Sequence, residues 1–172
     1  HRAHFASVLA EHGLEKALGF IFDGTGYGED GRLWGGEVFC GSITGAARIG
    51  TLLPLVLFGG EAAIRQPWRI GLYAVATACG AEGALSLFGE YPDAKALLSL
   101  ARPEPSPLSP LSSGMGRLFD AFAAIAGLGH AIAYEGQAAI ALEQAYDAGA
   151  EGRYRLNIQK EGSLLVFDWR EA

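Results

Sequence analysis

Cysteine and methionine are scarce in this sequence of 172 residues. The two cysteines, Cys40 and Cys79, lie far apart and neither belongs to a CxxC pair, which argues against a zinc motif or a disulfide framework. We therefore expect two buried, reduced thiols. The single methionine is Met115, so the chain does not start with an initiator residue. This start predicts that the chain is a piece of a longer protein.

Long apolar runs and an excess of basic charge are also missing. The uninterrupted apolar stretches are shorter than the roughly 18 residues that a membrane helix needs. The first residues lack the layout of a signal peptide. The net charge of -6 and the pI near 5.2 argue against a broad basic surface for nucleic acid. We expect a cytoplasmic protein that binds neither a membrane nor nucleic acid.

Hydrophobic residues make up 50% of the sequence, enough for one domain with a buried core. In the first half of the chain, periodicity and breaker residues predict helix 1–12, strand 18–22, glycine-rich turn 23–28, strand 33–39 and helix 61–73 interrupted at Pro67. From residue 74 onward they predict a further helix, loop 103–114, a helix with an apolar face of Leu118, Phe122 and Ile125, helix 135–146 and a hairpin over 154–167. In helix 135–146, Ile140 and Leu142 are expected in the core. Asp168 and Glu171 have capping-box spacing, so a new helix is expected to begin there. The sum is an α/β fold with an N-terminal helix, β-hairpins and a helix-rich middle.

Three residues could bind a divalent metal ion. His1 and His4, three positions apart, would share one face of the first helix, and Asp23 follows a strand. Imidazole and carboxylate groups are common ligands of divalent metals. The spacing alone leaves an alternative open, because histidines so placed are often incidental and an Asp before Gly commonly forms a turn.

The glycine-rich segment 23–28 is a second candidate site. Gly24, Gly26 and Gly28 would let the backbone approach a phosphate closely and donate N–H groups to it. The segment is neither a Walker A loop nor a strand–GxGxxG–helix unit, because a hairpin is expected to follow. An acidic residue followed by a Gly/Thr loop inside a hairpin is typical of actin-like ATPases. An ordinary glycine-rich hairpin is an equally good interpretation.

Residues 112–120 are a third candidate. A Ser/Gly loop there opens a helix, and the N-terminus of a helix can hold an anion. We expect Asp120 to lie in the first turn, where its carboxylate could accept hydrogen bonds from ribose hydroxyls. The alternative is plain helix capping, with an Asp that interacts favourably with the helix dipole.

Seven motifs resemble those of the HypF family of carbamoyltransferases and stand in the same order. They are HRAH at 1–4, DGTGYGEDG at 23–31, LWGGE at 33–37, GGE at 59–61, QPWR at 66–69, GRLFDA at 116–121 and YEGQ at 134–137. The resemblance covers nearly the whole chain. It implies the domain that HypF shares with TsaD, a tRNA threonylcarbamoyl transferase, and that domain has the actin-like ATPase (ASKHA) fold. We expect residues 1–172 to be a single partial Kae/TsaD-like domain without its C-terminal nucleotide loop.

The resemblance implies roles for particular residues. His4 and Asp23 match two metal ligands of the family, His1 matches an adjacent histidine, and the metal would be iron or zinc. The nucleoside of ATP or carbamoyl-adenylate would be held by the segments that contain Gly116, Asp120 and Gly136. Gly24, Gly26 and Gly28 would contact the phosphate. No residue is assigned as catalytic, because the nucleophile of the family is a thiol of the partner protein.

The resemblance also implies a reaction. Carbamoyl phosphate and ATP would give carbamoyl-adenylate in a neighbouring domain. The present domain would then transfer the carbamoyl group to the C-terminal cysteine of HypE, for the cyanide ligand of nickel–iron hydrogenases. Two alternatives stay open: a TsaD-like enzyme that acts on tRNA, and a folded fragment without catalysis. The chain alone is expected to be inactive and to bind ATP weakly.

Overall fold

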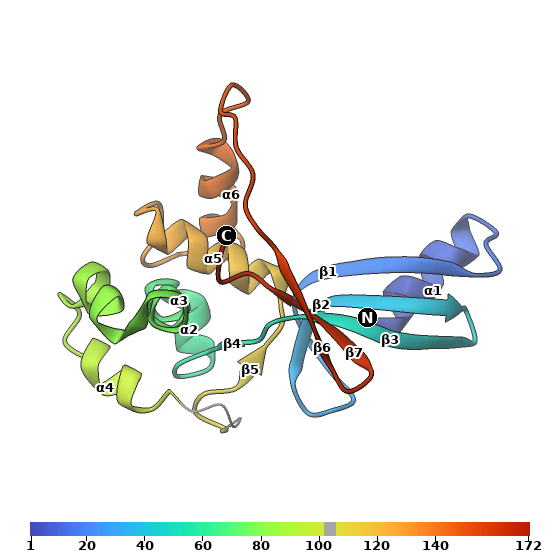
Figure 1. The fold of residues 1–172 in the computed structure, drawn as a ribbon, viewed down its shortest axis with the longest axis horizontal. Coiled ribbons are helices and arrows are strands. Elements are labelled where there is room, and N and C mark those ends of the chain that lie inside the picture. The colour runs from blue at the N-terminus through green and yellow to red at the C-terminus, as the bar shows by residue number, and fades with distance from the viewer. Residues whose placement is uncertain (102–105) are drawn as a thin grey trace.

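The computed structural model describes residues 1–101 and 106–172. Its elements in chain order are α1 (Arg2–Glu11), β1 (Ala17–Tyr27), β2 (Leu33–Ser42), β3 (Gly45–Leu52), β4 (Leu55–Val56), α2 (Glu61–Arg65), α3 (Trp68–Phe88), α4 (Ala94–Ser99), β5 (Leu111–Ser112), α5 (Met115–Ile125), α6 (Gln137–Gln144), β6 (Asn157–Glu161) and β7 (Leu164–Asp168). A strand-rich part carries α1, and a second part gathers the other helices (Figure 1). The predicted loop 103–114 contains the short strand β5, and residues 103–105 of it lie outside the described residues.

Seven strands form one mixed sheet. Their order is β4-β5-β2-β3-β7-β6, and β1 pairs with β2 off this path. β1, β2 and β3 are antiparallel neighbours, whereas β7 joins β3 in parallel. On α1, the buried Phe5 and Leu9 pack against Trp34 and Phe39 of β2. This cluster fixes the N-terminal helix, with His1 at its start, on the sheet.

The glycine-rich segment lies within a strand, so the turn predicted at 23–28 is wrong. β1 continues to Tyr27, and its pairing with β2 is irregular between Phe22 and Gly26. Such an irregularity is a bulge, which bends one strand locally while pairing resumes beyond it. The chain turns only after Gly28. Glycine tolerates both conformations, and the hydrogen bonds offered by β2 favour the extended one.

The long helix α3 supplies much of the core. Pro67 stands at its N-cap, which confirms the predicted break between two helices. Ile70 of α3 and Leu118 of α5 belong to one buried cluster. Among the described helices, α3 alone is long and apolar enough to cross a membrane by length and composition. The search for uninterrupted apolar runs missed it.

The two later helices follow their predictions in part. In α5, Leu118 is buried and Phe122 and Ile125 pack against the core, as predicted. In α6 the prediction fails for Ile140, which is 41% exposed, and the buried residue is Ala138. Helical spacing alone does not say which side of a short helix faces the core.

Both cysteines are exposed, so the expectation of buried thiols is wrong. Successive side chains of a strand point to opposite faces. Phe39 is the last buried residue of β2, whose two faces are both covered from Trp34 to Phe39, and Cys40 follows it where this cover ends. Cys79 lies in the exposed middle of α3. The position within an element, more than the hydrophobic character of cysteine, decides its burial here.

We expect both thiols to react with Ellman's reagent in the native chain. Exposed thiols are accessible to the reagent without unfolding. The measurement is the number of thiols titrated before and after addition of denaturant. Cys40→Ser and Cys79→Ser should each remove one equivalent from the native count. A native count near zero that rises only in denaturant would contradict the exposed positions.

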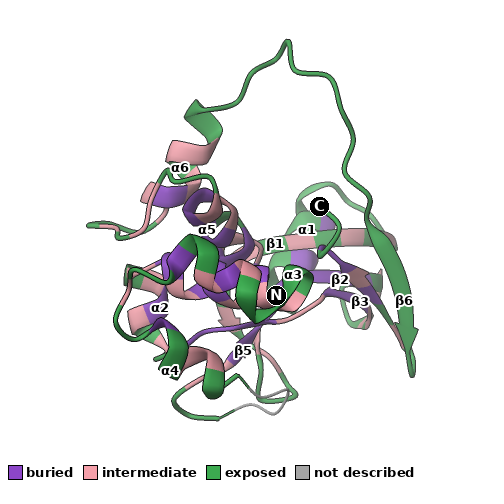
Figure 2. Ribbon diagram, turned by 60° about the vertical axis from the view of Figure 1, so that its left-hand side comes forward, coloured by how far each residue is buried: buried purple, intermediate pink, exposed green. Residues whose placement is uncertain are grey.

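The C-terminal hairpin of β6 and β7 is confirmed. All five residues of β6 are exposed, as Figure 2 shows in green, whereas β7 buries Val166 and Asp168. The capping box predicted at Asp168 is wrong. Asp168 accepts a hydrogen bond from the Arg170 N–H, but Glu171 binds Asn157 instead of reaching back. The helix expected to begin there is absent from the described residues.

The Asp168–Arg170 ion pair should make stability sensitive to acid. The hydrogen bond from the Arg170 side chain lowers the pKa of the buried Asp168 carboxyl below its usual range. A carboxyl whose pKa is lowered by folding stabilises the fold above its unfolded pKa, about 3.9, and loses this contribution as pH falls through the lower folded value. Asp168→Asn should remove this acid-dependent contribution to the free energy of unfolding. We expect the contribution to be roughly 1–2 kcal/mol, because solvent screens a pair whose Arg170 is partly exposed.

Urea unfolding between pH 2.5 and 6 measures this contribution. Glu151→Gln, at an exposed position away from the pair, is the matched control. Equal acid sensitivity of the wild type and Asp168→Asn would show that the ion pair does not contribute.

Candidate functional site

The bulge of β1 lies directly against the N-terminus of α5. A Cβ at Gly114 would be 2.2 Å from the carbonyl oxygen of Gly24, and one at Gly116 would be 3.0 Å from the Gly24 Cα. The two backbones can approach so closely because no side chain stands between them. The structure thus brings together the segments 23–28 and 112–120, which sequence reasoning had treated as separate candidates.

The three glycines of the bulge have different surroundings. A Cβ at Gly26 would lie 2.4 Å from the His1 ring, and one at Gly28 would lie 2.2 Å from Trp34. Side chains therefore pack over these two glycines. A Cβ at Gly24 would have only the ends of Glu135 and Arg117 near it, at 3.8 and 4.0 Å. Gly24 is the glycine of the segment with room for a ligand, and the phosphate contacts of all three stay predictions.

The imidazole that approaches Asp23 belongs to His1. The His1 Nε2 lies 3.5 Å from the Asp23 Oδ2, and the His1 side chain is 2% exposed. This nitrogen has no hydrogen-bond partner among the described residues. The His4 side chain is exposed, with its ring centroid 6.3 Å from that of His1. The prediction that His4 faces Asp23 is therefore not met, since α1 turns His1 toward the strand.

The donor set fits a metal ion only in part. An orphaned, buried imidazole nitrogen beside a carboxylate is what a metal would use. However, no three His, Cys, Asp or Glu side chains converge within residues 1–101 and 106–172. The expected three-residue cluster of His1, His4 and Asp23 is not formed. The described residues supply two converging donors, and no reaction step is derived through a metal.

A buried ion pair lies on α5, one turn from the bulge. Arg117 is 3% exposed and Asp120 is fully buried, and their Nη2 and Oδ2 atoms are 2.8 Å apart. The contact lacks hydrogen-bond geometry: both Asp120 oxygens and the Arg117 Nε have no hydrogen-bond partner among the described residues. Burial raises the pKa of the Asp120 carboxyl, against the opposing charge of Arg117. Removing charges from water is costly, so such a pair calls for a functional reason.

Asp120 occupies a different position from the one predicted. α5 begins at Met115, so Asp120 lies in the second turn and not the first. Its side chain turns into the protein and does not line the nearby cavity. The simple capping role predicted as an alternative is therefore wrong. Contact of Asp120 with a ribose stays a prediction.

A second buried carboxylate, Glu37, lies beneath the site. Arg48 donates from Nε to Glu37 at 2.6 Å, and the hydroxyl groups of Thr51 and Ser113 also donate to it. Ser113 immediately precedes Gly114, so the network ties the start of α5 to β2 and β3. Sequence reasoning quoted Glu37 within the LWGGE motif but gave it no role. A lone acidic residue within an apolar strand, LWGGEVF, was the available signal.

A cavity of about 570 Å³ opens beside Gly24. Its lining comes from the bulge, α2, α5 and the segment before α6, and consists of Thr25, Glu61, Ile64, Arg65, Arg117, Ile132, Ala133, Tyr134 and Glu135. Gly136, predicted to hold the nucleoside, follows Glu135 at the N-cap of α6 with a left-handed φ of 79°. Sequence reasoning quoted Arg117 and Glu135 within motifs but gave them no role. For Arg117 the available signal was the pair of opposite charges at 117 and 120 in an otherwise apolar helix.

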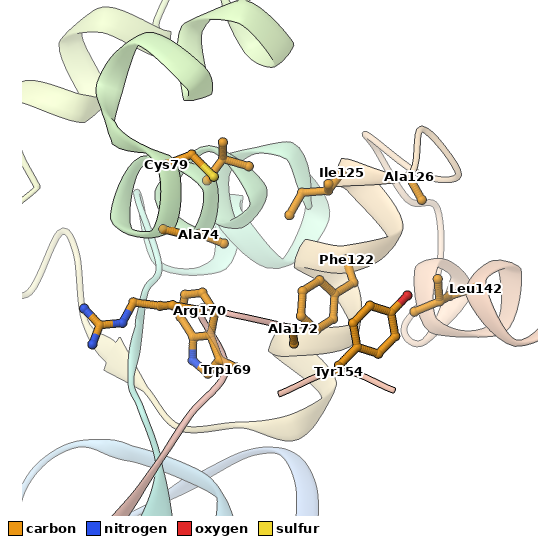
Figure 3. Close-up of a pocket in the computed structure, with 12 residues that line it drawn as sticks. Ala74, Cys79, Phe122, Ile125, Ala126, Leu142, Tyr154, Trp169, Arg170 and Ala172 are labelled. Atoms are coloured by element: carbon orange, nitrogen blue, oxygen red, sulfur yellow. The ribbon is translucent and has the colours of Figure 1, made fainter. Parts of the chain in front are cut away.

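A second cavity, of about 480 Å³, is apolar and lies away from these groups. It runs between α3 and α5 toward the C-terminus, where Phe122, Tyr154 and Trp169 surround it (Figure 3). The Trp169 indole donates to the Leu53 carbonyl at 2.7 Å. Its lining offers little for chemistry, so the candidate site is the cavity beside Gly24.

Comparisons with known proteins agree with this fold. Residues 19–172 match the family model "Carbamoyltransferase, Kae1-like Domain, second subdomain". Carbamoyltransferase HypF2 of Cupriavidus necator is 42% identical over 144 residues, covering 83% of this chain and 18% of the relative. Carbamoyltransferase HypF of Synechocystis is 36% identical over 188 residues, covering 99% of this chain and 24% of the relative.

A solved structure is also similar. The crystal structure of full-length HypF in its phosphate- and nucleotide-bound form superposes with a TM-score of 0.83 at 34% identity, covering 98% of this chain and 22% of that one. The fold is that of a Kae1-like domain, and this confirms the predicted α/β class. The chain belongs to the HypF family of carbamoyltransferases. It spans about a fifth of the length of the curated relatives it matches.

Proposed function

We propose that this chain forms part of the carbamoyl-transfer site of an ATP-dependent enzyme of nickel–iron hydrogenase maturation. The acceptor would be the C-terminal cysteine of a HypE-type protein in the cytoplasm. The observation that carries the proposal is the meeting of the Gly24 bulge and the N-terminus of α5 beside one cavity. Membership of the HypF family supports it.

The reaction would transfer one acyl group. The acceptor thiol attacks the carbamoyl carbon of carbamoyl-adenylate, so a C–S bond forms and the bond from carbon to the phosphate oxygen breaks. AMP leaves with the electron pair of that bond, and the thiol proton passes to solvent. The product is a protein thiocarbamate. A neighbouring domain would make the adenylate from ATP and carbamoyl phosphate.

The residues of this chain would bind and orient the adenylate. Gly24 leaves space for the ligand, and the segments of Gly116, Asp120 and Gly136 would hold the nucleoside. His1 and Asp23, the two donors that converge, would hold a divalent ion, iron or zinc. Such an ion would supply Lewis acidity toward the carbamoyl oxygen.

Labelled carbamoyl phosphate tests the proposal in a full-length protein that carries this chain. With ATP and a HypE-type acceptor, label should appear in the acceptor, and an acceptor that lacks its C-terminal cysteine should stay unlabelled. Label in tRNA instead would favour the TsaD-like alternative. Absence of label from both acceptors, while carbamoyl-adenylate still forms, would contradict the transfer role.

A further inference from the structure

Two charged side chains flank the open backbone of Gly24. The Arg117 Nη2 lies 4.0 Å, and the Glu135 Oε1 3.8 Å, from the point where a Gly24 side chain would begin. Both residues line the cavity of about 570 Å³. The site thus places a hydrogen-bond donor and a carboxylate acceptor around a position that glycine leaves empty.

The donor is fixed in place and incompletely satisfied. Arg117 is buried, its Nη2 is 2.8 Å from Asp120, and its Nε has no hydrogen-bond partner among the described residues. A buried guanidinium N–H without a partner is costly to the fold. An unpaired N–H of this kind is tolerated most readily where a ligand oxygen accepts its hydrogen bond. Asp120 contacts Arg117 from within the protein, since Asp120 is fully buried and does not line the cavity.

The charges of the cavity select the ligand chemistry. Arg65 and Glu61 form an ion pair, 3.5 Å apart, at the exposed rim. Asp120 offsets the charge of Arg117, so Glu135, an exposed residue of the lining, is the acidic group left beside Gly24. A dianionic phosphate would meet this carboxylate unfavourably. A neutral planar group with one acceptor and one N–H donor could accept from Arg117 and donate to Glu135.

We propose that Arg117 and Glu135 recognise the carbamoyl group itself, with its plane over Gly24, its carbonyl oxygen accepting from Arg117 and its amino group donating to Glu135. This inference rests on the proposed function, and it assigns recognition of the carbamoyl group to these two residues. Asp120 is a positioning residue that acts through Arg117. The amino group distinguishes a carbamoyl from an acetyl group of similar size, so Glu135 determines specificity.

Two stable probes that differ only at this amino group test the proposal. Carbamoylphosphonate carries an NH₂ group where acetylphosphonate carries a methyl group, and inorganic phosphate has neither. Binding to the ¹⁵N-labelled chain is followed at the amides of Gly24, Thr25 and Glu135. The chain should prefer carbamoylphosphonate by about tenfold, because a site that pairs an N–H group rejects the analogue that lacks it.

The variants give a pattern that a general loss of structure would not. Glu135→Ala, at an exposed position, should weaken carbamoylphosphonate by about tenfold and leave acetylphosphonate unchanged. Arg117→Lys should weaken both probes equally, because both have the carbonyl. Glu143→Ala, which removes an exposed carboxylate on α6 outside the cavity lining, is the control and should change neither.

Three results would overturn the inference. They are equal binding of the two probes, a preference that survives Glu135→Ala, and no shift at these amides with either probe. Binding of phosphate as tight as that of carbamoylphosphonate would mean that the cavity reads the phosphate group. Carbamoyl transfer by the full-length protein that persists in both variants would remove this inference and leave the proposed function standing. No transfer by the wild-type full-length protein, together with a probe preference that is present in the wild type and lost in Glu135→Ala, would remove the proposed function and leave this inference standing.

Discussion

Replacing Gly114 by alanine should unfold the junction between β1 and α5 and lower the melting temperature by roughly 6–12 °C. The new Cβ would lie 2.2 Å from the Gly24 carbonyl oxygen, far inside van der Waals contact. Backbone atoms, unlike the end of a flexible side chain, cannot rotate away. Overpacking of this kind costs about 1–3 kcal/mol, and the close contact with the Gly24 backbone puts Gly114→Ala at the upper end.

Gly45→Ala is the matched control for this prediction. Gly45 lies at the exposed start of β3, and a Cβ there would meet only the Ser42 hydroxyl, at 3.8 Å. Its melting temperature should change by about 2 °C or less. Calorimetry on both variants decides the question. A Gly114→Ala variant as stable as Gly45→Ala would mean that the bulge does not rest on α5 as described.

Asp120→Asn should reduce carbamoyl transfer by the full-length protein about tenfold, equivalent to about 1.4 kcal/mol. Hydrogen bonds to a charged group are the stronger ones, worth about 1.5–3 kcal/mol, and a neutral amide replaces the carboxylate. The loss is expected whether Asp120 contacts a ribose or holds Arg117. The nucleotide affinity of Asp120→Asn distinguishes these roles. The affinity should fall if Asp120 contacts the ribose, whereas positioning of Arg117 does not require it to fall.

Folding should change differently from transfer in this variant. Burial raises the pKa of Asp120, so the folded carboxyl binds its proton more tightly than the unfolded one. Stability therefore falls as pH rises from the ordinary carboxyl range, about 3.9, through the raised value. Asp120→Asn should remove this fall. Asp93→Asn, at an exposed ion pair with Arg69, is the control and should keep it. Unchanged transfer with lowered stability would leave Asp120 a purely structural role.

Local sequence patterns were enough to predict most elements. The apolar stripe of Phe5 and Leu9 gave α1, Pro67 gave the break before α3, and alternation with a Gly162 turn gave the last hairpin. These features depend on residues near one another in the chain, where periodicity and breakers act. Prediction failed where segments distant in sequence decide the outcome, as in the parallel pairing of β7 with β3 and the short strand β5.

The candidate site was predictable as a set of segments but not as a geometry. The motifs around Asp23, Gly116 and Gly136 could be read from the chain, whereas their meeting at Gly24 depends on tertiary packing. The same packing turns Asp120 inward and brings His1, in place of His4, to Asp23. Side-chain direction on a helix follows from what covers it, and a single sequence does not show that partner.

Asp23→Ala tests most directly whether the bulge of β1 positions the adenylate for carbamoyl transfer. In a full-length protein that carries the chain, two reactions are measured side by side: carbamoyl-phosphate-dependent exchange of pyrophosphate into ATP, and thiocarbamate formation on the acceptor cysteine. For Asp23→Ala we predict normal exchange and transfer reduced at least about a hundredfold, because the adenylate still forms but is no longer positioned. Transfer at the wild-type rate by Asp23→Ala, with exchange equally intact, would show that the bulge has no part in carbamoyl transfer.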